Sequence, residues 1–448
     1  MGDRQPNESL RRLYAATGWT LRQFAQEVNK VATERGKPTR YQGPSAHQWL
    51  DGHLPKEEVR PLILEALARR LQRPVTHAEA GFPTPAYDKH DVNTVEGLLD
   101  LGRQDMDPSR RTVIGAGAKL FSVALAIPGW QDVVGRMEAV QSGRMQRIGM
   151  PEVDSVIAMT DRLSDLDDQF GGRYARPMAA AFMVNIVAPY LKTDAPSEVR
   201  KAMVSAASFL CYLTGWMAVD EGVHGTAQQY YVKGLELAGA SGDHSTYCHI
   251  LRGMSVQSVD LGHGSTAVAW ANAASEASPT AGPRMTAFMA GQQAHSYAVA
   301  GERSNALRSI RETETALNKA NSQGGTFGGY NAATLAYHTA QVRQALGDVA
   351  GSVDSLQLCF RLRNSKNDSH RGDMRFGAML AERQLAIGHL DAACATWGKV
   401  VDGYPTIQSG QVDKHVTEMF RLIRPHLKNS AARDLYERAR LTAPSLAA

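Results

Sequence analysis

Three polar side chains lie close together within residues 43–52 and could read the edges of DNA bases. They are Ser45, His47 and Gln48. A Gln side chain can form two hydrogen bonds with adenine in the major groove, and Ser can bond to several base edges. Basic side chains nearby could hold phosphates without reading sequence, and these are Lys30, Lys37 and Arg40. The pattern predicts a DNA-recognition segment. The alternative is a small helical bundle whose charged face is only solvated.

No combination of residues that could carry catalysis stands out. His244, Cys248 and His249 are close in sequence but lack a fourth ligand, so we expect no zinc site. The carboxylates of Asp354, Asp373 and Glu382 are expected to be isolated surface groups. We therefore expect neither an enzyme nor a bound cofactor. The sequence has four cysteines, Cys211, Cys248, Cys359 and Cys394. They show no CxxC spacing, which favours buried thiols in a reducing cytosol.

The elements that would carry the N-terminal polar residues are predicted to be helices. Thr20 and Gln23 have the spacing of a capping box, and apolar residues follow at helical intervals, which predicts a helix from about Leu21 to Arg35. Pro44 favours the start of a second helix, and Pro55 prevents its continuation. A third apolar-periodic segment covers residues 62–71. These three segments predict a small helical bundle.

Several phrases in this region resemble the Cro/repressor-type helix-turn-helix family, also called XRE. They are residues 20–25 (TLRQFA), 45–52 (SAHQWLDG) and 63–68 (ILEALA), and the resemblance covers residues 8–82. It implies that Gln48 and Ser45 read bases. Leu21 replaces a polar residue of the family, and the segment before the recognition helix is longer than usual. The full set expected to contact DNA is Arg22, Gln23, Lys30, Lys37, Arg40, Gln42, Ser45, His47 and Gln48.

The charge of the chain is concentrated at its N-terminal end. Residues 1–82 carry 13 Lys and Arg against nine Asp and Glu, and the whole chain carries 49 against 45, so residues 83–448 have no net charge. A basic module joined to a neutral one indicates that the first meets a polyanion. No uninterrupted apolar run reaches the about 18 residues of a membrane span, and the polar N-terminus lacks an export signal. We therefore expect a cytoplasmic protein without a membrane partner.

Residues 83–135 are predicted to be a linker that ends in a docking helix over about residues 113–127. Beyond it, glycines recur 39 to 46 residues apart, and small residues stand seven before and five after each glycine. Small residues at these positions let paired helices approach closely while the glycine forms the turn. The pattern predicts five helix pairs. The repeating glycines are Gly222, Gly262, Gly301, Gly347 and Gly388.

This spacing resembles the tetratricopeptide repeat over residues 205–404. Residues 136–204 and 405–448 are also expected to be helical and to cap the array. The predicted organisation is a helix-turn-helix domain at 1–82, a linker with its docking helix at 83–135, and a repeat domain at 136–448. The predicted fold class is all-α, with an N-terminal bundle and a C-terminal α-solenoid.

The combination of domains resembles a group of actinomycete regulators that includes negative regulators of sporulation and antibiotic production. The phrases at residues 213–216 (LTGW), 220–222 (DEG) and 227–231 (AQQYY) carry this resemblance. It implies a transcription regulator, expected to be a repressor, that binds double-stranded DNA. We expect a homodimer held by the repeat domain, because the sequence contains no coiled-coil heptads. The alternative is an interaction scaffold whose N-terminal bundle does not bind DNA.

The first helix of each pair is expected to line an inner groove. Counting back from the turn glycines places Tyr212, Trp216 and Glu382 at inward positions, although Tyr212 and Trp216 could simply be core residues. The mixture of aromatic and hydrogen-bonding side chains suits a peptide or protein effector. The residues expected to bind the effector are Arg252, His295, Tyr337 and Gln341.

Overall fold

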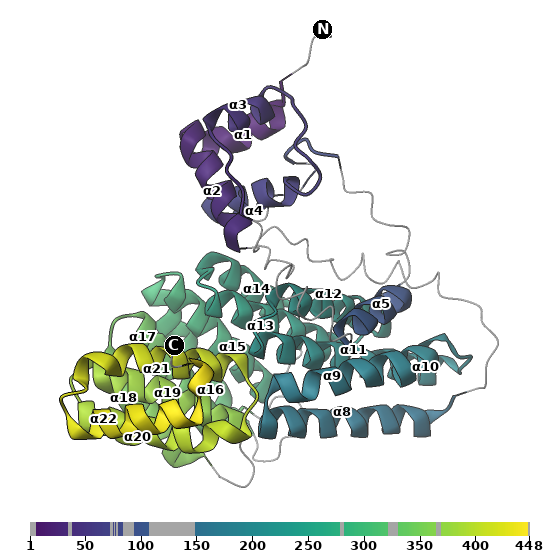
Figure 1. Ribbon diagram of the computed structural model, residues 1–448. Helices are drawn as coiled ribbons and strands as arrows, with labels where there is room; N and C mark the ends of the chain where they lie inside the picture. The colour runs from purple at the N-terminus through teal and green to yellow at the C-terminus, as the bar shows by residue number, and fades with distance from the viewer. Residues whose placement is uncertain are drawn as a thin grey trace.

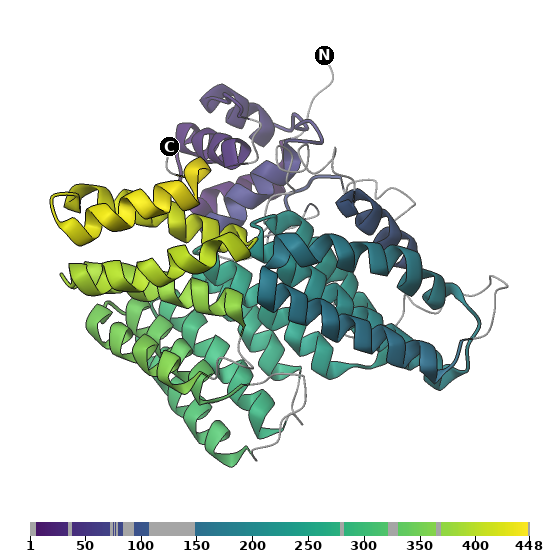
Figure 2. The ribbon, with the colours of Figure 1, turned by 60° about the horizontal axis from the view of Figure 1, so that its bottom comes forward.

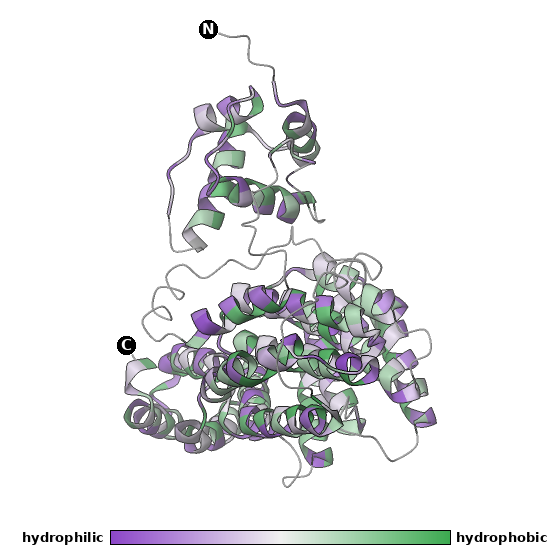
Figure 3. Cartoon of the chain, turned by 90° about the vertical axis from the view of Figure 1, so that its right-hand side faces the viewer, coloured by the Kyte–Doolittle hydropathy of each residue, from purple (hydrophilic) through white to green (hydrophobic). Residues whose placement is uncertain are grey.

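Every regular element in the described part of the chain is a helix, which confirms the predicted all-α class. The computed structural model describes residues 6–34, 38–71, 75, 77, 79–83, 94–106, 148–277, 282–320, 330–363 and 369–446. Figure 1 shows two groups of helices, a small N-terminal bundle and a larger array. In Figure 3, hydrophobic and hydrophilic residues alternate along the helices of both groups, as amphipathic helices require.

Four helices form the N-terminal bundle: α1 (Glu8–Thr17), α2 (Leu21–Glu34), α3 (Gly43–Leu50) and α4 (Arg60–Leu71). The predicted capping box starts α2, because the Thr20 amide donates to Gln23 Oε1 at 2.8 Å and the Gln23 amide donates to Thr20 Oγ1 at 3.3 Å. Phe24 and Trp49 pack edge to face with centroids 5.9 Å apart, which joins α2 to α3. The sequence analysis predicted the last three helices.

The first helix was not predicted. Its start is capped by Asn7, whose side chain accepts a hydrogen bond from the Leu10 amide at 3.0 Å. Leu10 and Leu13 are buried in the bundle core. The signal was present as an N-cap residue followed by two apolar residues three apart, but the segment is short and strongly charged.

The array consists of stacked helix pairs. Figure 2 shows the pairs of its C-terminal half, coloured green to yellow, as successive rows. The first three elements are α8 (Met150–Phe170), α9 (Gly172–Phe182) and α10 (Ala188–Lys192), with a π-helical turn at Met183–Val187 before α10. The repeating pairs are α11 (Ser197–Asp220) with α12 (His224–Ser241), α13 (His244–Asp260) with α14 (Gly264–Glu276), α15 (Pro283–Val299) with α16 (Arg303–Lys319), α17 (Ala332–Ala345) with α18 (Val349–Leu362), and α19 (His370–Ala386) with α20 (Leu390–Gly403). A last pair, α21 (Gly410–Ile423) and α22 (Ser430–Thr442), ends the array.

The predicted repeat positions do what their spacing requires. All five repeating glycines lie at the turn within a pair with φ between 77° and 86°, a left-handed conformation that costs other residues energy. The small residues face each other across each pair. Ser255 Oγ donates to the Ala267 carbonyl at 2.9 Å, and Ser352 Oγ donates to the Ala340 carbonyl at 2.7 Å. The five predicted helix pairs are therefore confirmed.

One part of the expected linker belongs to the array. Helix α5 (Thr94–Met106) packs against α9 and α12, and its Leu98 is fully buried. Asp105 on α5 forms a buried ion pair with Arg176 of α9 and accepts a hydrogen bond from the Tyr230 hydroxyl at 3.0 Å. The array therefore includes an element that the sequence analysis assigned to the linker. The docking helix expected at residues 113–127 lies outside the described residues.

Helix α11 is long and apolar enough to cross a membrane by length and composition alone. Most of its apolar window is buried inside the array, against α12, α9 and α8. Its hydropathy is therefore that of a core helix. The four cysteines are also buried, as predicted.

The first helices of the pairs form the inner layer of the array. Consecutive first helices α11, α13, α15 and α17 contact one another, whereas α12, α14, α16 and α18 pack mainly against first helices. In a curved stack of helix pairs, the layer whose members touch each other lies on the inner side. Side chains on this layer are therefore the ones that meet near the axis of the array.

Candidate nucleic-acid interface and inner face of the array

The outward side of α3 carries the polar residues expected to contact DNA. Gln42, His47 and Gln48 are exposed and Ser45 is partly exposed. The opposite side is buried, as predicted, and consists of Ala46, Trp49 and Leu50. We call Gln42, Ser45, His47 and Gln48 the α3 face. It is a short helical surface whose hydrogen-bonding groups are available to a partner.

The N-terminal ends of α2 and α3 lie against each other. A Cβ placed on Gly43 would stand 3.7 Å from Leu21 Cβ and 3.8 Å from the Arg22 amide nitrogen. Arg22 and Gln23 are both exposed there, although the Gln23 amide oxygen is engaged in the cap of α2. Two helix N-termini and an arginine at one place create a positive region, which favours phosphate groups.

The other cations expected to hold phosphates have different surroundings. Lys30 is exposed and lies 3.8 Å from Glu27, one turn earlier on α2. Arg40 is exposed in the loop before α3. Lys37 lies outside the described residues. The structure thus places Lys30 and Arg40 on the surface of the bundle, on the two segments that flank the α3 face.

Asp51 orients one residue of the α3 face. Its Oδ2 lies 2.7 Å from His47 Nδ1, and its Oδ1 accepts a hydrogen bond from Arg11 at 2.7 Å. Because both carboxylate oxygens are engaged, Asp51 fixes the His47 ring. The sequence analysis did not foresee the contact with Arg11, which comes from a helix that it had not predicted.

Asn29 holds the long loop before α3 and was missed. Its side-chain amide donates to the Tyr41 carbonyl at 2.8 Å, and its Oδ1 accepts from the Tyr41 amide and the Thr39 hydroxyl, each at 2.8 Å. Tyr41 in turn packs edge to face on Trp49. The side-chain amide of Asn29 therefore fixes the path of the loop and the start of α3. An Asn in a helix gives little sequence signal for this role.

A continuous series of aromatic rings runs along the inner layer. Tyr212 of α11 meets His249 of α13, which meets Phe288 of α15, with centroids 5.7 and 5.0 Å apart. Farther along, Tyr337 of α17 stacks on Phe376 of α19 at 4.4 Å. Tyr212, Phe288, Tyr337 and Phe376 are partly exposed. The inner face therefore offers flat apolar surface from four of the five repeating pairs.

Arg252 lies within this series. Its guanidinium carbon stands 3.8 Å from the centre of the Phe288 ring, and its side chain is 9% exposed. Burial lowers the pKa of Arg252, and the neighbours acting on its charge are tyrosines. In the described part of the chain no carboxylate forms an ion pair with it. A guanidinium without a counter-charge is unusual in a buried position.

The other predicted effector residues are also brought together. His295 is buried, and its pKa is lowered to about 3, first by burial and then by Arg375, Arg383 and Arg252. Gln341 accepts a hydrogen bond from Arg383 through its Oε1. These residues converge on one region of the inner layer, as expected. Arg252, His295 and Gln341 are buried, so the structure places them deeper than the groove that the sequence analysis described. The Tyr337 ring is partly exposed.

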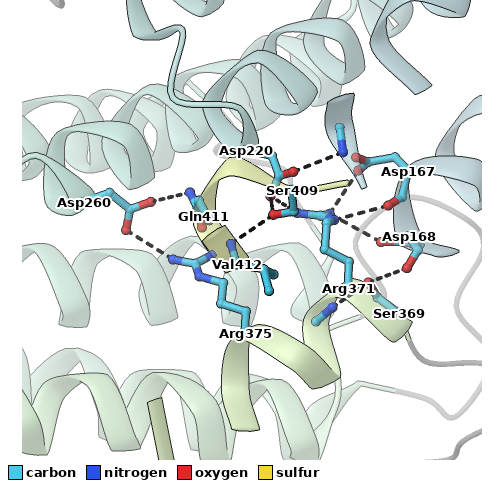
Figure 4. Close-up of polar contacts among 12 residues, drawn as sticks. Asp167, Asp168, Asp220, Asp260, Ser369, Arg371, Arg375, Ser409, Gln411 and Val412 are labelled. Carbon is cyan, nitrogen blue, oxygen red and sulfur yellow. Dashed lines mark hydrogen bonds and ion pairs between the residues drawn. The ribbon is translucent and has the colours of Figure 1, made fainter. Parts of the chain in front are cut away.

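Polar contacts join distant parts of the array around Arg371 of α19, as Figure 4 shows. Its guanidinium donates to Asp167 of α8 at 2.9 Å and to Asp220 of α11 at 3.2 Å. Asp220 also accepts from the Ser409 hydroxyl at 2.7 Å. We call Asp167, Asp220, Arg371 and Ser409 the clasp. It joins residues 204 positions apart and is entirely buried, so it closes the stack of pairs on itself.

A second connection lies beside the clasp. Arg375 of α19 contacts Asp260 of α13 at 3.3 Å, and Gln411 of α21 donates to the other oxygen of Asp260 at 3.3 Å (Figure 4). Two of the carboxylates expected to be isolated have partners, because Asp373 accepts from Arg363 and Glu382 from His415, each at 2.7 Å. Asp354 is exposed, as expected.

Side chains that could bind a metal ion are not clustered in the described residues. No group of three His, Cys, Asp or Glu side chains suited to a metal occurs among them. Burial raises the pKa of the Cys211 thiol far above its ordinary value, which makes that thiol a poor nucleophile.

The N-terminal region matches a known family model. The model is described as the SP15 N-terminal domain, and it matches residues 10–83. These residues contain most of α1 and all of α2, α3 and α4, so the match coincides with the bundle and ends near the predicted boundary at residue 82. A search of curated proteins gave no match.

Proposed function

We propose that this protein is a cytoplasmic, sequence-specific DNA-binding regulator of transcription, and that it acts as a non-enzymatic repressor. The observation that supports this function best is the exposed α3 face beside the adjoining N-termini of α2 and α3. Gln48 and Ser45 can bond to base edges while Arg22 and Arg40 hold phosphates. Such a division of roles is what a small helical reader of the major groove requires.

The array supplies dimerisation and effector binding in this proposal. A single bundle of this size covers few base pairs, so two copies on adjacent half-sites are needed for useful affinity. The inner face, with its buried Arg252 and its aromatic series, offers the effector site. Light scattering at micromolar concentration is expected to give twice the mass of the chain, and a monomer that binds its site tightly would exclude this arrangement.

The test of base reading is the change Gln48→Ala. Bound sites are first mapped across the genome, and gel shifts then compare a mapped site with random duplex DNA. We expect Gln48→Ala to weaken binding to the mapped site by about 1–3 kcal/mol and to leave random DNA nearly unaffected. Gln344→Ala is the matched control, because Gln344 is exposed on α17. Equal losses on both kinds of DNA would exclude a base-reading role. Failure of the wild type to bind DNA would favour the alternative function, an interaction scaffold whose N-terminal bundle does not bind DNA.

A further inference from the structure

Among the described residues, no carboxylate forms an ion pair with the buried positive charge of Arg252. Its side chain is 91% buried, and its Nε has no hydrogen-bond partner in the described residues. The Phe288 ring under the guanidinium gives some electrostatic attraction but carries no charge. Within the described residues, folding therefore removes this cation from water without placing an anion beside it, which is costly. A ligand that carries an anion would remove this cost.

The neighbouring cations make the region more positive. After burial, the charges of three arginines lower the pKa of His295, and these are Arg375, Arg383 and Arg252. Asp260 neutralises Arg375, whereas Arg383 bonds only to neutral groups, the Ser352 hydroxyl and the Gln341 amide oxygen among them. The region thus holds two buried arginines without a carboxylate in ion-pair contact. They come from α13 and α19, and both lower the pKa of His295.

The walls of the region indicate which anion fits. Tyr212, Phe288 and Tyr337 are partly exposed rings beside Arg252, so an apolar body can pack on them. A carboxylate matches the planar fork of a guanidinium through two parallel hydrogen bonds. A phosphate dianion would cost more to remove from water than a carboxylate, because it carries more charge.

We propose that the inner face binds a carboxylate attached to a flat apolar body, and that Arg252 forms the ion pair with it. This inference rests on the effector site of the proposed function and names the chemistry of the effector. The carboxylate can belong to a small organic acid or to the C-terminus of a peptide. In both cases its amide, which has the same shape without the charge, does not bind.

The test is thermal unfolding of the full chain with matched acids and amides. The probes are benzoate against benzamide, and a tripeptide ending in phenylalanine as its free acid against its C-terminal amide. Sodium chloride and inorganic phosphate at equal ionic strength control for salt. The variants are Arg252→Met, Arg252→Lys and, as a matched control, Arg311→Met, since Arg311 is exposed on α16.

We expect at least one acid to raise the wild-type Tm by about 2–4 °C, while its amide and the salts do not. Arg252→Met should abolish the rise, Arg252→Lys should reduce it, and Arg311→Met should keep it. Without ligand, Arg252→Met should be at least as stable as wild type, because it removes an unbalanced buried charge.

Two results would overturn the proposal. One is that acids and amides act alike on the wild type. The other is that Arg252→Met alone lowers the Tm without ligand, which would make Arg252 a structural residue. Neither readout involves DNA, so a chain that binds acids but not DNA would refute the proposed function and leave this inference standing.

Discussion

The clasp contains one arginine between two aspartates in a buried position, and replacing Arg371 with Met tests its role. Arg371 is 8% exposed and serves two carboxylates, those of Asp167 and Asp220, which are each 2% exposed. The change leaves both carboxylates buried without a cation. Removing one partner of a buried ion pair typically costs about 3–5 kcal/mol. We expect a loss of that size in the free energy of unfolding.

The assay is urea unfolding followed by circular dichroism, with hydrogen exchange to locate the loss. Exchange should accelerate first in α8 and α19, because the clasp joins these helices. Arg438→Met is the matched control. Arg438 also pairs with an aspartate of another helix, Asp402, but both side chains are at least half exposed, so its loss should stay below about 1 kcal/mol. Equal losses in the two variants would refute the reasoning.

The pH dependence of this loss gives a second check. Burial raises the pKa of Asp167 from 3.8 to about 7, and Arg371 opposes that shift. In Arg371→Met the pKa must rise further, because burial, Asp220 and Asp168 all act upward. The folded state then holds the proton more tightly than the unfolded chain, so acidification stabilises it. The loss should be smaller at pH 6 than at pH 8, by about 1–2 kcal/mol.

Two further predictions concern the loop before α3 and the buried histidines. Asn29→Ala should destabilise the bundle by about 1–3 kcal/mol in thermal unfolding and weaken binding to specific and random DNA alike, because it frees the loop carrying Tyr41; unchanged binding would exclude a positioning role. The wild type should lose stability as pH falls below about 6.5, since burial lowers the pKa of His249 and His295 to about 3 and of His224 to about 4. The unfolded chain binds protons that the buried histidines of the folded chain do not, so the free energy of unfolding falls by up to about 1.4 kcal/mol per histidine for each pH unit. Asp167 acts in the opposite direction, because its pKa is raised in the folded state. Equal melting temperatures at pH 7 and pH 5.5 would contradict this.

The repeat array was predictable because its requirements are local. A turn with positive φ needs glycine, and a close helix crossing needs a small residue, so both leave a fixed spacing in the sequence. Gly301 and Ala294 are examples, with φ of 82° and complete burial. The α3 face was predictable for a similar reason, since the buried position of Trp49 decides which residues point outward. In each case one short segment contains the whole signal.

The contacts that the sequence did not reveal depend on distant segments. In the sequence, Asp105 of the expected linker is indistinguishable from a surface carboxylate. Only the fold brings Arg176 and Tyr230 into contact with it. Asp167 and Arg371 are 204 residues apart, and their contact depends on how many pairs stack and how steeply the stack curves. Neither quantity follows from the residues of one pair. Ion pairs of this kind therefore become visible only in three dimensions.

Arg252 shows how the two sources of information combine. Counting back from a turn glycine placed it on the inner face, and the structure confirms that placement on α13. The count could not show that Arg375 finds its carboxylate in Asp260 while Arg252 finds none in the described residues. Arg375 therefore joins two helices of the array through an ion pair, whereas Arg252 is the residue that we propose binds the anion of a ligand. Because both lie near His295, a ligand at Arg252 would act on the same few side chains that hold α19 in place.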